Sequence, residues 1–143
     1  MNLPKPVVGL VINYSYLWHH EHARGFHEGF KDRPCAIVLT VHAPSPEVTI
    51  LGITHTAPSA DDHALEIPAS VKRRLGLDDK PSWIVTTEAN VFTWPGPDLR
   101  PRNPDDQTSI AYGFLPGDVV LELRRRVGRH AVSGHIRVVK RTE

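Results

Sequence analysis

An arginine and a threonine at the ends of two neighbouring apolar runs have the chemistry to bind a phosphate group. Arg33 leads into the apolar residues 36–39, and Thr54 closes the run of residues 47–54. Antiparallel strands that are neighbours in a sheet bring such ends together. A guanidinium matches two phosphate oxygens at once, and a hydroxyl adds a further hydrogen bond. The pair predicts a phosphate site, unless Arg33 is a strand-edge cation paired with Asp32 or with a helix carboxylate.

Further polar residues close to this pair in the sequence suit proton transfer or phosphate contact. His55 follows Thr54 and titrates near neutral pH, so it is a candidate general acid or base. The basic run Lys72, Arg73 and Arg74 falls on a predicted short helix. This run predicts either contacts to phosphates or a solvated helix face.

Residues 15–31 form a long, polar, histidine-rich excursion with a helical stretch expected over residues 18–27. Long loops in compact domains are often binding loops or lids. Within it, His19, His20 and Lys31 are candidates for phosphate contacts. Trp18 is a candidate platform for an unpaired base, and burial in the core is the alternative for this ring.

The histidines of this excursion also raise the question of a metal site. His19 and His22 are three residues apart and would share a helix face, and Glu21 and His27 lie close by. No His-Glu-x-x-His pattern is present, and no fourth ligand is evident. We therefore expect no metal and no other cofactor, and keep a metal-dependent hydrolase built on this loop as one rival hypothesis.

The elements that must position these residues are mostly short strands. Apolar and β-branched runs predict a strand at each of six places: residues 7–14, 34–41, 47–54, 63–67, 83–88 and 91–94. The last two are separated by an expected turn at Ala89-Asn90. A helix is expected between Pro68 and Gly76, with Val71 and Leu75 on its buried face.

A second helix should open at residues 116–118, with Asp118 as its cap, and Gly128 is the candidate terminator. Residues 136–139 are left open between a late strand and a loose tail. This pattern predicts a mostly-β fold, a small β-barrel with short helices.

Length and charge predict one domain with a basic end. The 143 residues carry a net charge of +1, but residues 121–143 hold seven Lys or Arg against two Glu, which makes that end +5 and the remainder −4. The chain is expected to be a single domain over residues 1–143, with a core at about 7–130 and a basic, loose tail at 131–143. The basic end suits an anionic partner or is simply solvated.

Cysteine usage and hydropathy bear on the compartment. One cysteine excludes an intramolecular disulfide framework, which fits the cytoplasm. No apolar run approaches the ~20 residues of a membrane span. We therefore expect a cytoplasmic protein with no membrane partner.

Several of these motifs together resemble the PemK/MazF family of toxin endoribonucleases from bacterial toxin–antitoxin modules. The resemblance rests on Gly9-Leu10-Val11-Ile12, on the run from Arg33 to Leu39 that begins Arg-Pro-Cys, and on Ile53-Thr54. Glu66-Ile67 and residues 116–129 continue it in the same order. The subgroup with Tyr-x-Tyr-Leu-Trp-His is similar over residues 14–19.

The resemblance implies a fold and an activity. It implies an SH3-like barrel of the PemK/MazF toxin type with a C-terminal helix, acting as a homodimer. The implied activity is sequence-selective cleavage of single-stranded RNA, such as mRNA, without metal or cofactor. In that reaction the 2′-hydroxyl attacks the neighbouring phosphate, translation and growth are inhibited, and a cognate antitoxin protein blocks the groove.

The resemblance also suggests residue roles. Arg33 occupies the position of the catalytic arginine, and Thr54 would position the phosphate. Glu88 matches a carboxylate proposed in some relatives as the base, although a structural role beside Arg33 is the alternative. Thr86 stands where some relatives have an arginine. This departure sustains a second rival, a non-catalytic barrel of the same family that binds RNA or a protein.

Overall fold

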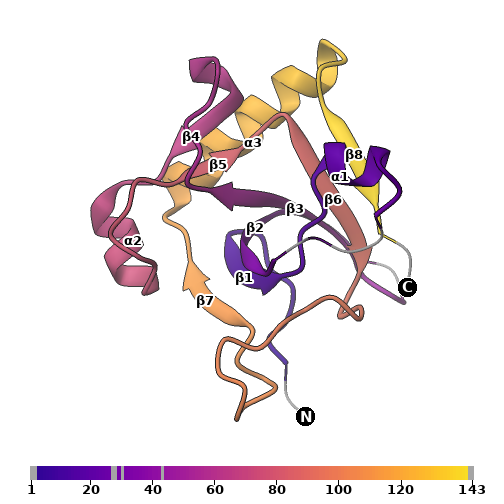
Figure 1. Cartoon of the computed structure of the whole chain (residues 1–143), viewed down its shortest axis with the longest axis vertical. Helices are drawn as coiled ribbons and strands as arrows, with labels where there is room; N and C mark the ends of the chain where they lie inside the picture. Colours follow the sequence, from indigo (N-terminus) through magenta and orange to yellow (C-terminus); the bar gives the residue numbers. More distant parts are fainter. Residues whose placement is uncertain (1–2, 27–28, 30, 43, 142–143) are drawn as a thin grey trace.

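A computed structural model describes residues 3–26, 29, 31–42 and 44–141 of the chain. The strands in this part are β1 Leu10–Tyr14, β2 Arg33–Val41, β3 Glu47–Thr54, β4 Ala64–Glu66, β5 Trp83–Val85, β6 Glu88–Thr93, β7 Ala111–Phe114 and β8 Arg137–Lys140. The helices are α1 His19–Ala23, α2 Ala69–Leu75 and α3 Gly117–Val132, with a 3-10 turn, η1, at Asp61–His63. The prediction of a mostly-β fold is confirmed (Figure 1).

The strands form one branched sheet around β3. Its main path runs β4-β5-β3-β2-β1-β7, and β6 and β8 lie off this path. One edge of β3 is shared: residues 47–50 pair with β6, whereas Ile53 and Thr54 pair with β5. The described strands do not close on themselves, so the expectation of a closed barrel is wrong for this part of the chain.

Alternating side chains place apolar residues on both faces of the sheet. Along β3, Leu51 and Ile53 join one buried cluster, while Val48 and Ile50 join another. Successive side chains of a strand point to opposite faces of the sheet, which accounts for this division. Both faces are covered, which explains why the strand reads as a nearly continuous apolar run.

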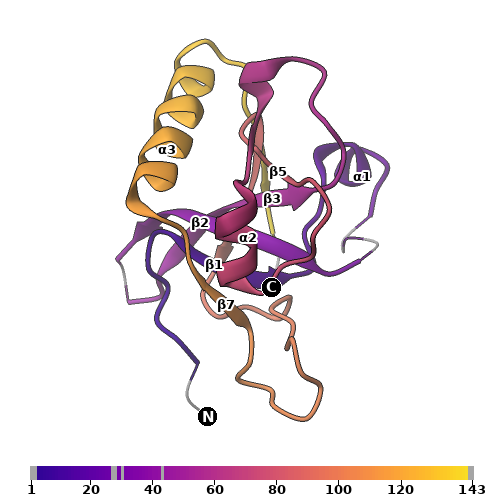
Figure 2. The same cartoon turned by 90° about the vertical axis from the view of Figure 1, so that its left-hand side faces the viewer.

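Helices α2 and α3 cover the first of these clusters. Val71 and Leu75 of α2 are buried, as predicted, together with Val119 and Leu123 of α3. Pro68 precedes α2, and Gly76 ends it with a φ of 72°, in the left-handed region that favours glycine. In Figure 2, α3 runs along one side of the molecule and α2 lies in front of the sheet.

The expected turn at Ala89-Asn90 is wrong, because both residues are buried inside the continuous strand β6. The Asn90 side chain accepts a hydrogen bond from the Leu17 amide at 2.9 Å and donates one to the Leu17 carbonyl at 2.7 Å. A turn-forming residue type therefore sits within a strand because a distant backbone satisfies its amide.

Helix α3 also differs from its prediction. It begins after Pro116, places Asp118 in its first turn rather than at the cap, and continues through Gly128 to Val132. The extra turn buries His130, whose Nε2 lies 2.9 Å from the Asp62 carbonyl. Helix propensity at one glycine is a small effect, and this tertiary contact overrides it.

The basic tail is not loose over the residues described. Strand β8 pairs in parallel with β6, and Figure 1 shows the two side by side. Beyond it, Arg141 is 6% exposed and forms an ion pair with Asp98, with an Nη2–Oδ2 distance of 3.0 Å. Of the two alternatives for residues 136–139, the late strand is therefore confirmed and the loose tail is wrong, because a charge-rich composition does not reveal that Arg141 pairs with a buried carboxylate.

None of the helices in the described residues has the length and apolar character that crossing a bilayer requires.

Candidate active site

A cleft of about 620 Å³ opens where the ends of β2 and β3 approach the start of β6 and helix α1; we call it the β2–β3 cleft. Its lining contains most of the residues that the sequence singled out: Trp18, His20, Lys31, Arg33, Thr54, His55 and Glu88. These residues come from segments up to 70 positions apart. The sheet therefore brings the predicted phosphate ligands and proton-transfer groups into one place.

Strand register accounts for the central pair. In β2 and β3, Cys35 lies opposite Gly52, and extending this antiparallel register by two residues places Arg33 across from Thr54. The Arg33 Nη1 donates to the Ile53 carbonyl at 3.3 Å, on the same strand end as Thr54. The expected meeting of the two strand ends is confirmed.

The Arg33 side chain has no carboxylate in direct contact among the described residues. Besides Ile53, its guanidinium carbon lies 4.8 Å from the centre of the Trp18 ring, and its buried Nε has no partner in the described structure. Asp32, which the sequence offered as a partner, lies 3.6 Å from Arg100 instead. Burial lowers the pKa of Arg33. Because no described carboxylate neutralises the guanidinium, its positive charge is available to bind an anion in the cleft.

Glu88 brings a carboxyl group to the same cleft from the first position of β6. Its Oε1 accepts a hydrogen bond from the His19 amide at 2.9 Å. Burial raises the pKa of Glu88, an effect larger than the opposing influence of the His19 hydrogen bond. A carboxyl group whose pKa is moved toward neutrality suits a general base near neutral pH.

His55 is oriented by a short chain of charged groups. Its Nε2 lies 2.7 Å from Oδ2 of Asp78, and the Lys72 Nζ lies 2.7 Å from the other oxygen of that carboxylate. Lys72 also donates to the Ser82 hydroxyl and to the Lys80 carbonyl. Asp78 therefore fixes one ring nitrogen of His55 and leaves the other for the cleft.

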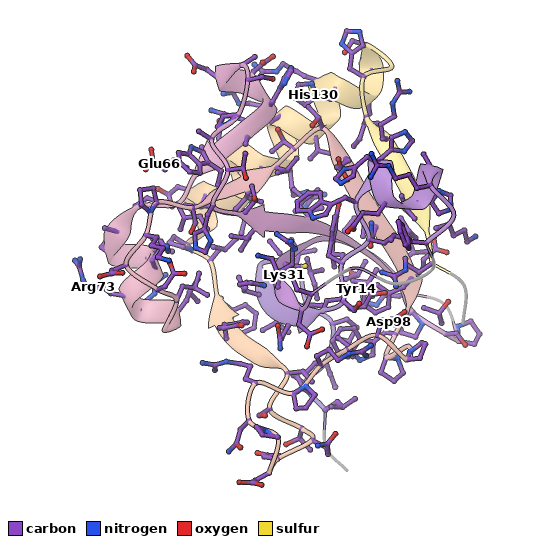
Figure 3. The ribbon with its side chains drawn as sticks, viewed as in Figure 1. Tyr14, Lys31, Glu66, Arg73, Asp98 and His130 are labelled. Carbon is purple, nitrogen blue, oxygen red and sulfur yellow. The ribbon has the colours of Figure 1, made fainter. Side chains whose placement is uncertain are left out.

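This arrangement changes the interpretation of the basic run on α2. Lys72 is 4% exposed and its ammonium is held within the protein, so it cannot reach a phosphate. Arg73 and Arg74 are exposed, but neither lines the β2–β3 cleft. Figure 3 places Arg73 on α2, well separated from Lys31. The three residues do not form one patch with the cleft, and RNA contacts by Arg73 and Arg74 remain a prediction.

Asp78 offers a direct check on this chain of charges. The hydrogen bond from Lys72 is the main cause that lowers the pKa of Asp78 to about 2. Since the folded pKa is depressed, the carboxylate stabilises the fold above its unfolded pKa of about 3.9, and this contribution is lost as the pH falls toward 2. We expect the Asp78 carboxyl to titrate near pH 2 by NMR, and at higher pH in Lys72→Met. A native midpoint near 4 would contradict the contact.

Helix α1 is shorter than expected, and its residues serve different purposes. Trp18 precedes it, with its amide donating to Oε1 of the buried Glu21 at 2.9 Å. The Trp18 ring packs on Tyr16 as well as under Arg33. His20 lines the cleft, whereas His19 contributes its backbone amide to Glu88. The ring of Trp18 therefore belongs partly to the core and partly to the cleft wall.

The described part of the chain contains no set of ligands that would support the hypothesis of a metal-dependent hydrolase. No three side chains of His, Cys, Asp or Glu come close enough there to hold a metal ion. Another candidate ligand, His27, lies outside the described residues.

Sequence reasoning missed His63, which lines the cleft from the end of η1. Its position depends on Thr86, which is buried and whose hydroxyl donates to the Asp62 and His63 carbonyls at 3.1 and 3.0 Å. The Thr86 amide also donates to the His63 carbonyl. Nothing local in the sequence signals this contact, because the two segments are more than twenty residues apart.

Comparison with known proteins does not extend this description: the chain matches no protein-family model, and no curated protein matches it. The resemblance to PemK/MazF toxins rests on the motifs quoted above.

Proposed function

We propose that this protein is a metal-independent endoribonuclease that cleaves single-stranded RNA in the β2–β3 cleft. One observation supports this most: Arg33, Thr54 and Glu88 line a single cleft, and the carboxyl among them has a raised pKa. Together they supply a cation, a hydroxyl and a base. A phosphodiester with an adjacent 2′-hydroxyl is a substrate that uses all three.

The reaction assigns one task to each side chain. Glu88 accepts the proton of the 2′-hydroxyl, whose oxygen bonds to the adjacent phosphorus. Arg33 stabilises the charge on the phosphorane oxygens, and Thr54 donates to a non-bridging oxygen. The bond from phosphorus to the 5′-oxygen then breaks, and His55, held by Asp78, protonates that oxygen when its imidazole is charged. The products are a 2′,3′-cyclic phosphate and a 5′-hydroxyl.

The wider proposal follows the resemblance to PemK/MazF toxins. In it, the mostly-β sheet is a variant of the SH3-like barrel, and the protein is a cytoplasmic toxin whose cleavage of mRNA inhibits translation and growth. The partners are a cognate antitoxin protein and a second copy of the chain. The order of motifs from Gly9 to Arg129 supports this assignment.

The decisive experiment is cleavage of mixed-sequence single-stranded RNA in excess chelator. We expect fragments that end in 2′,3′-cyclic phosphate. Complete absence of cleavage by the folded protein, free of any antitoxin and tested across many sequences, would reject the nuclease. Cleavage that chelator abolishes would instead favour the metal-dependent rival.

A second candidate function is RNA or protein binding without catalysis. Thr86 favours it, because some PemK/MazF relatives have an arginine at this place. Here the Thr86 side chain is buried and hydrogen-bonded to η1, so it contributes no charge to the cleft. RNA binding without cleavage would support this candidate.

Glu88→Gln separates the two functions. We expect cleavage to fall by about 10²- to 10⁴-fold, because the base is removed while an amide oxygen still accepts from His19. In the native protein, activity should rise as the pH rises through the elevated pKa of Glu88, since the base must be ionised. Rate measurements from pH 4 to 8 should show that this acidic limb is absent from the variant.

Stability provides the control for this variant. A raised pKa means that the folded state binds the Glu88 proton more tightly than the unfolded state. Stability therefore falls as the pH rises from about 4.3 through the raised pKa. Glu88→Gln should be at least as stable as the native protein at pH 7. Lower stability together with lower activity would indicate a structural role instead.

A further inference from the structure

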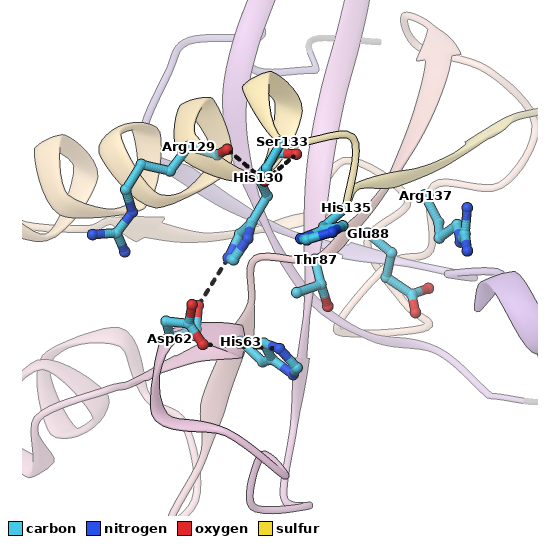
Figure 4. A pocket seen from close by; sticks show the side chains of 9 residues that line it. All are labelled: Asp62, His63, Thr87, Glu88, Arg129, His130, Ser133, His135 and Arg137. Atoms are coloured by element: carbon cyan, nitrogen blue, oxygen red, sulfur yellow. Dashed lines mark hydrogen bonds and ion pairs between the residues drawn. The ribbon is translucent and has the colours of Figure 1, made fainter.

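A second cleft, of about 570 Å³, lies between the end of α3 and the start of β8; we call it the α3–β8 cleft. Figure 4 shows Arg129 and Arg137 on opposite sides of it, with the imidazoles of His130 and His135 between them. The two arginines come from α3 and β8. The proposed chemistry in the β2–β3 cleft does not use them.

The arginine side chains of this cleft have no polar partner among the described residues, whereas its two carboxyl groups have described neighbours. Among the described residues, neither the Arg129 nor the Arg137 guanidinium takes part in an ion pair or hydrogen bond. By contrast, Asp62 has its Oδ1 3.8 Å from Nε2 of His63, and Glu88 accepts from the His19 amide. The two guanidinium groups are therefore available to bind an anionic ligand.

The two clefts are continuous with each other. His63, Thr87 and Glu88 line both of them. Glu88 therefore stands at the junction, with Arg33 on one side and Arg137 on the other. A ligand that places a phosphate beside Arg33 and extends past Glu88 enters the α3–β8 cleft.

We propose that the α3–β8 cleft binds a neighbouring phosphate of the same single-stranded RNA, through Arg129 and Arg137. The inference rests on the proposed nuclease function and adds a binding site to it. Arg129 and Arg137 do not touch the reacting phosphate. They bind the RNA strand on one side of the reacting phosphate, so they increase the affinity for RNA and do not change the rate of the chemical step.

The test uses RNA that binds but cannot be cut. In 2′-O-methyl oligonucleotides of mixed sequence the attacking hydroxyl is blocked, and lengths from three to nine nucleotides can be compared by fluorescence anisotropy. We expect the native protein to bind the nonamer much more tightly than the trimer. In Arg129→Gln/Arg137→Gln, nonamer affinity should fall about ten- to a hundredfold, and the slope of log K against log salt should become shallower by about 0.7, the value for one phosphate of a single strand.

Arg124→Gln/Lys140→Gln is the matched control, because it removes two charges from the same two elements outside both clefts. We expect its affinity to stay within about threefold of native. Equal losses in the two double variants would overturn the inference, since they would report net charge alone. Native protein that neither binds nor cleaves RNA would instead reject the proposed function, and the two failures are therefore distinguishable.

Discussion

Replacing Arg33 with alanine is expected to lower the rate of RNA cleavage by about 10²- to 10³-fold. The guanidinium lines the β2–β3 cleft, and its neighbours among the described residues are a carbonyl and an aromatic ring rather than a carboxylate that would neutralise it. An anion in the cleft therefore meets a positioned, largely uncompensated cation. The comparison should be made in single-turnover cleavage assays, where product release does not limit the rate.

Arg33→Lys is the informative companion variant. It retains the charge but not the fork that contacts two oxygens, so we expect an intermediate loss. Thermal unfolding of both variants should show a modest change, because the stacking of Arg33 on Trp18 is worth about 0.5–2 kcal/mol. Native-like cleavage by folded Arg33→Ala would remove Arg33 from the mechanism.

Replacing Arg141 with methionine is expected to lower the free energy of unfolding by about 3–5 kcal/mol. The Arg141 guanidinium is buried, pairs with Asp98 at 3.0 Å, and donates to the Ser15 carbonyl at 2.7 Å and to Asn90 at 3.1 Å. Methionine fills the volume but supplies no charge. Asp98, itself 6% exposed, would then lose its closest described cation.

Urea denaturation measures this change, and Lys140→Met on the neighbouring position is the control. Lys140 has a 78% exposed side chain and lies 3.7 Å from Glu47, so its replacement should cost less than about 0.5 kcal/mol. A loss below about 1 kcal/mol in Arg141→Met would mean that the tail is held mainly by the pairing of β8 with β6.

Local patterns predicted the elements whose boundaries are set locally. Strand β3 has its predicted bounds, Glu47–Thr54, because its apolar and β-branched residues form one run in the sequence. Helix α2 lies between Pro68 and Gly76, where the sequence placed it. Strand β7 was not expected at all, since Gly113 lies at its centre and its partner, β1, is about a hundred residues earlier. Strand β7 forms because it pairs with the distant strand β1, and a short stretch of sequence around residues 111–114 does not reveal that partner.

In the candidate site too, contacts between consecutive strands could be predicted from the sequence, whereas contacts between distant segments could not. The meeting of Arg33 with Thr54 could be predicted, because the two strands are consecutive and antiparallel. The position of His63 depends on Thr86, and the burial of Lys72 depends on Ser82 and Asp78. Such contacts are invisible in a run of residue types. Lys72 in particular has the same appearance in the sequence as its exposed neighbours Arg73 and Arg74.

The parallel pairing of β8 with β6 has a consequence for the order in which the protein is assembled during synthesis. Residues 137–141 leave the ribosome well after residues 88–93, yet Arg141 binds Ser15 and Asn90, and Asn90 in turn holds Leu17 beside the cleft wall. A nascent chain that has released β1 to β7 contains both Asn90 and Leu17 but still lacks the hydrogen bonds that Arg141 donates to Ser15 and Asn90. The wall of the β2–β3 cleft therefore gains its last described restraints only after residue 141 has emerged from the ribosome.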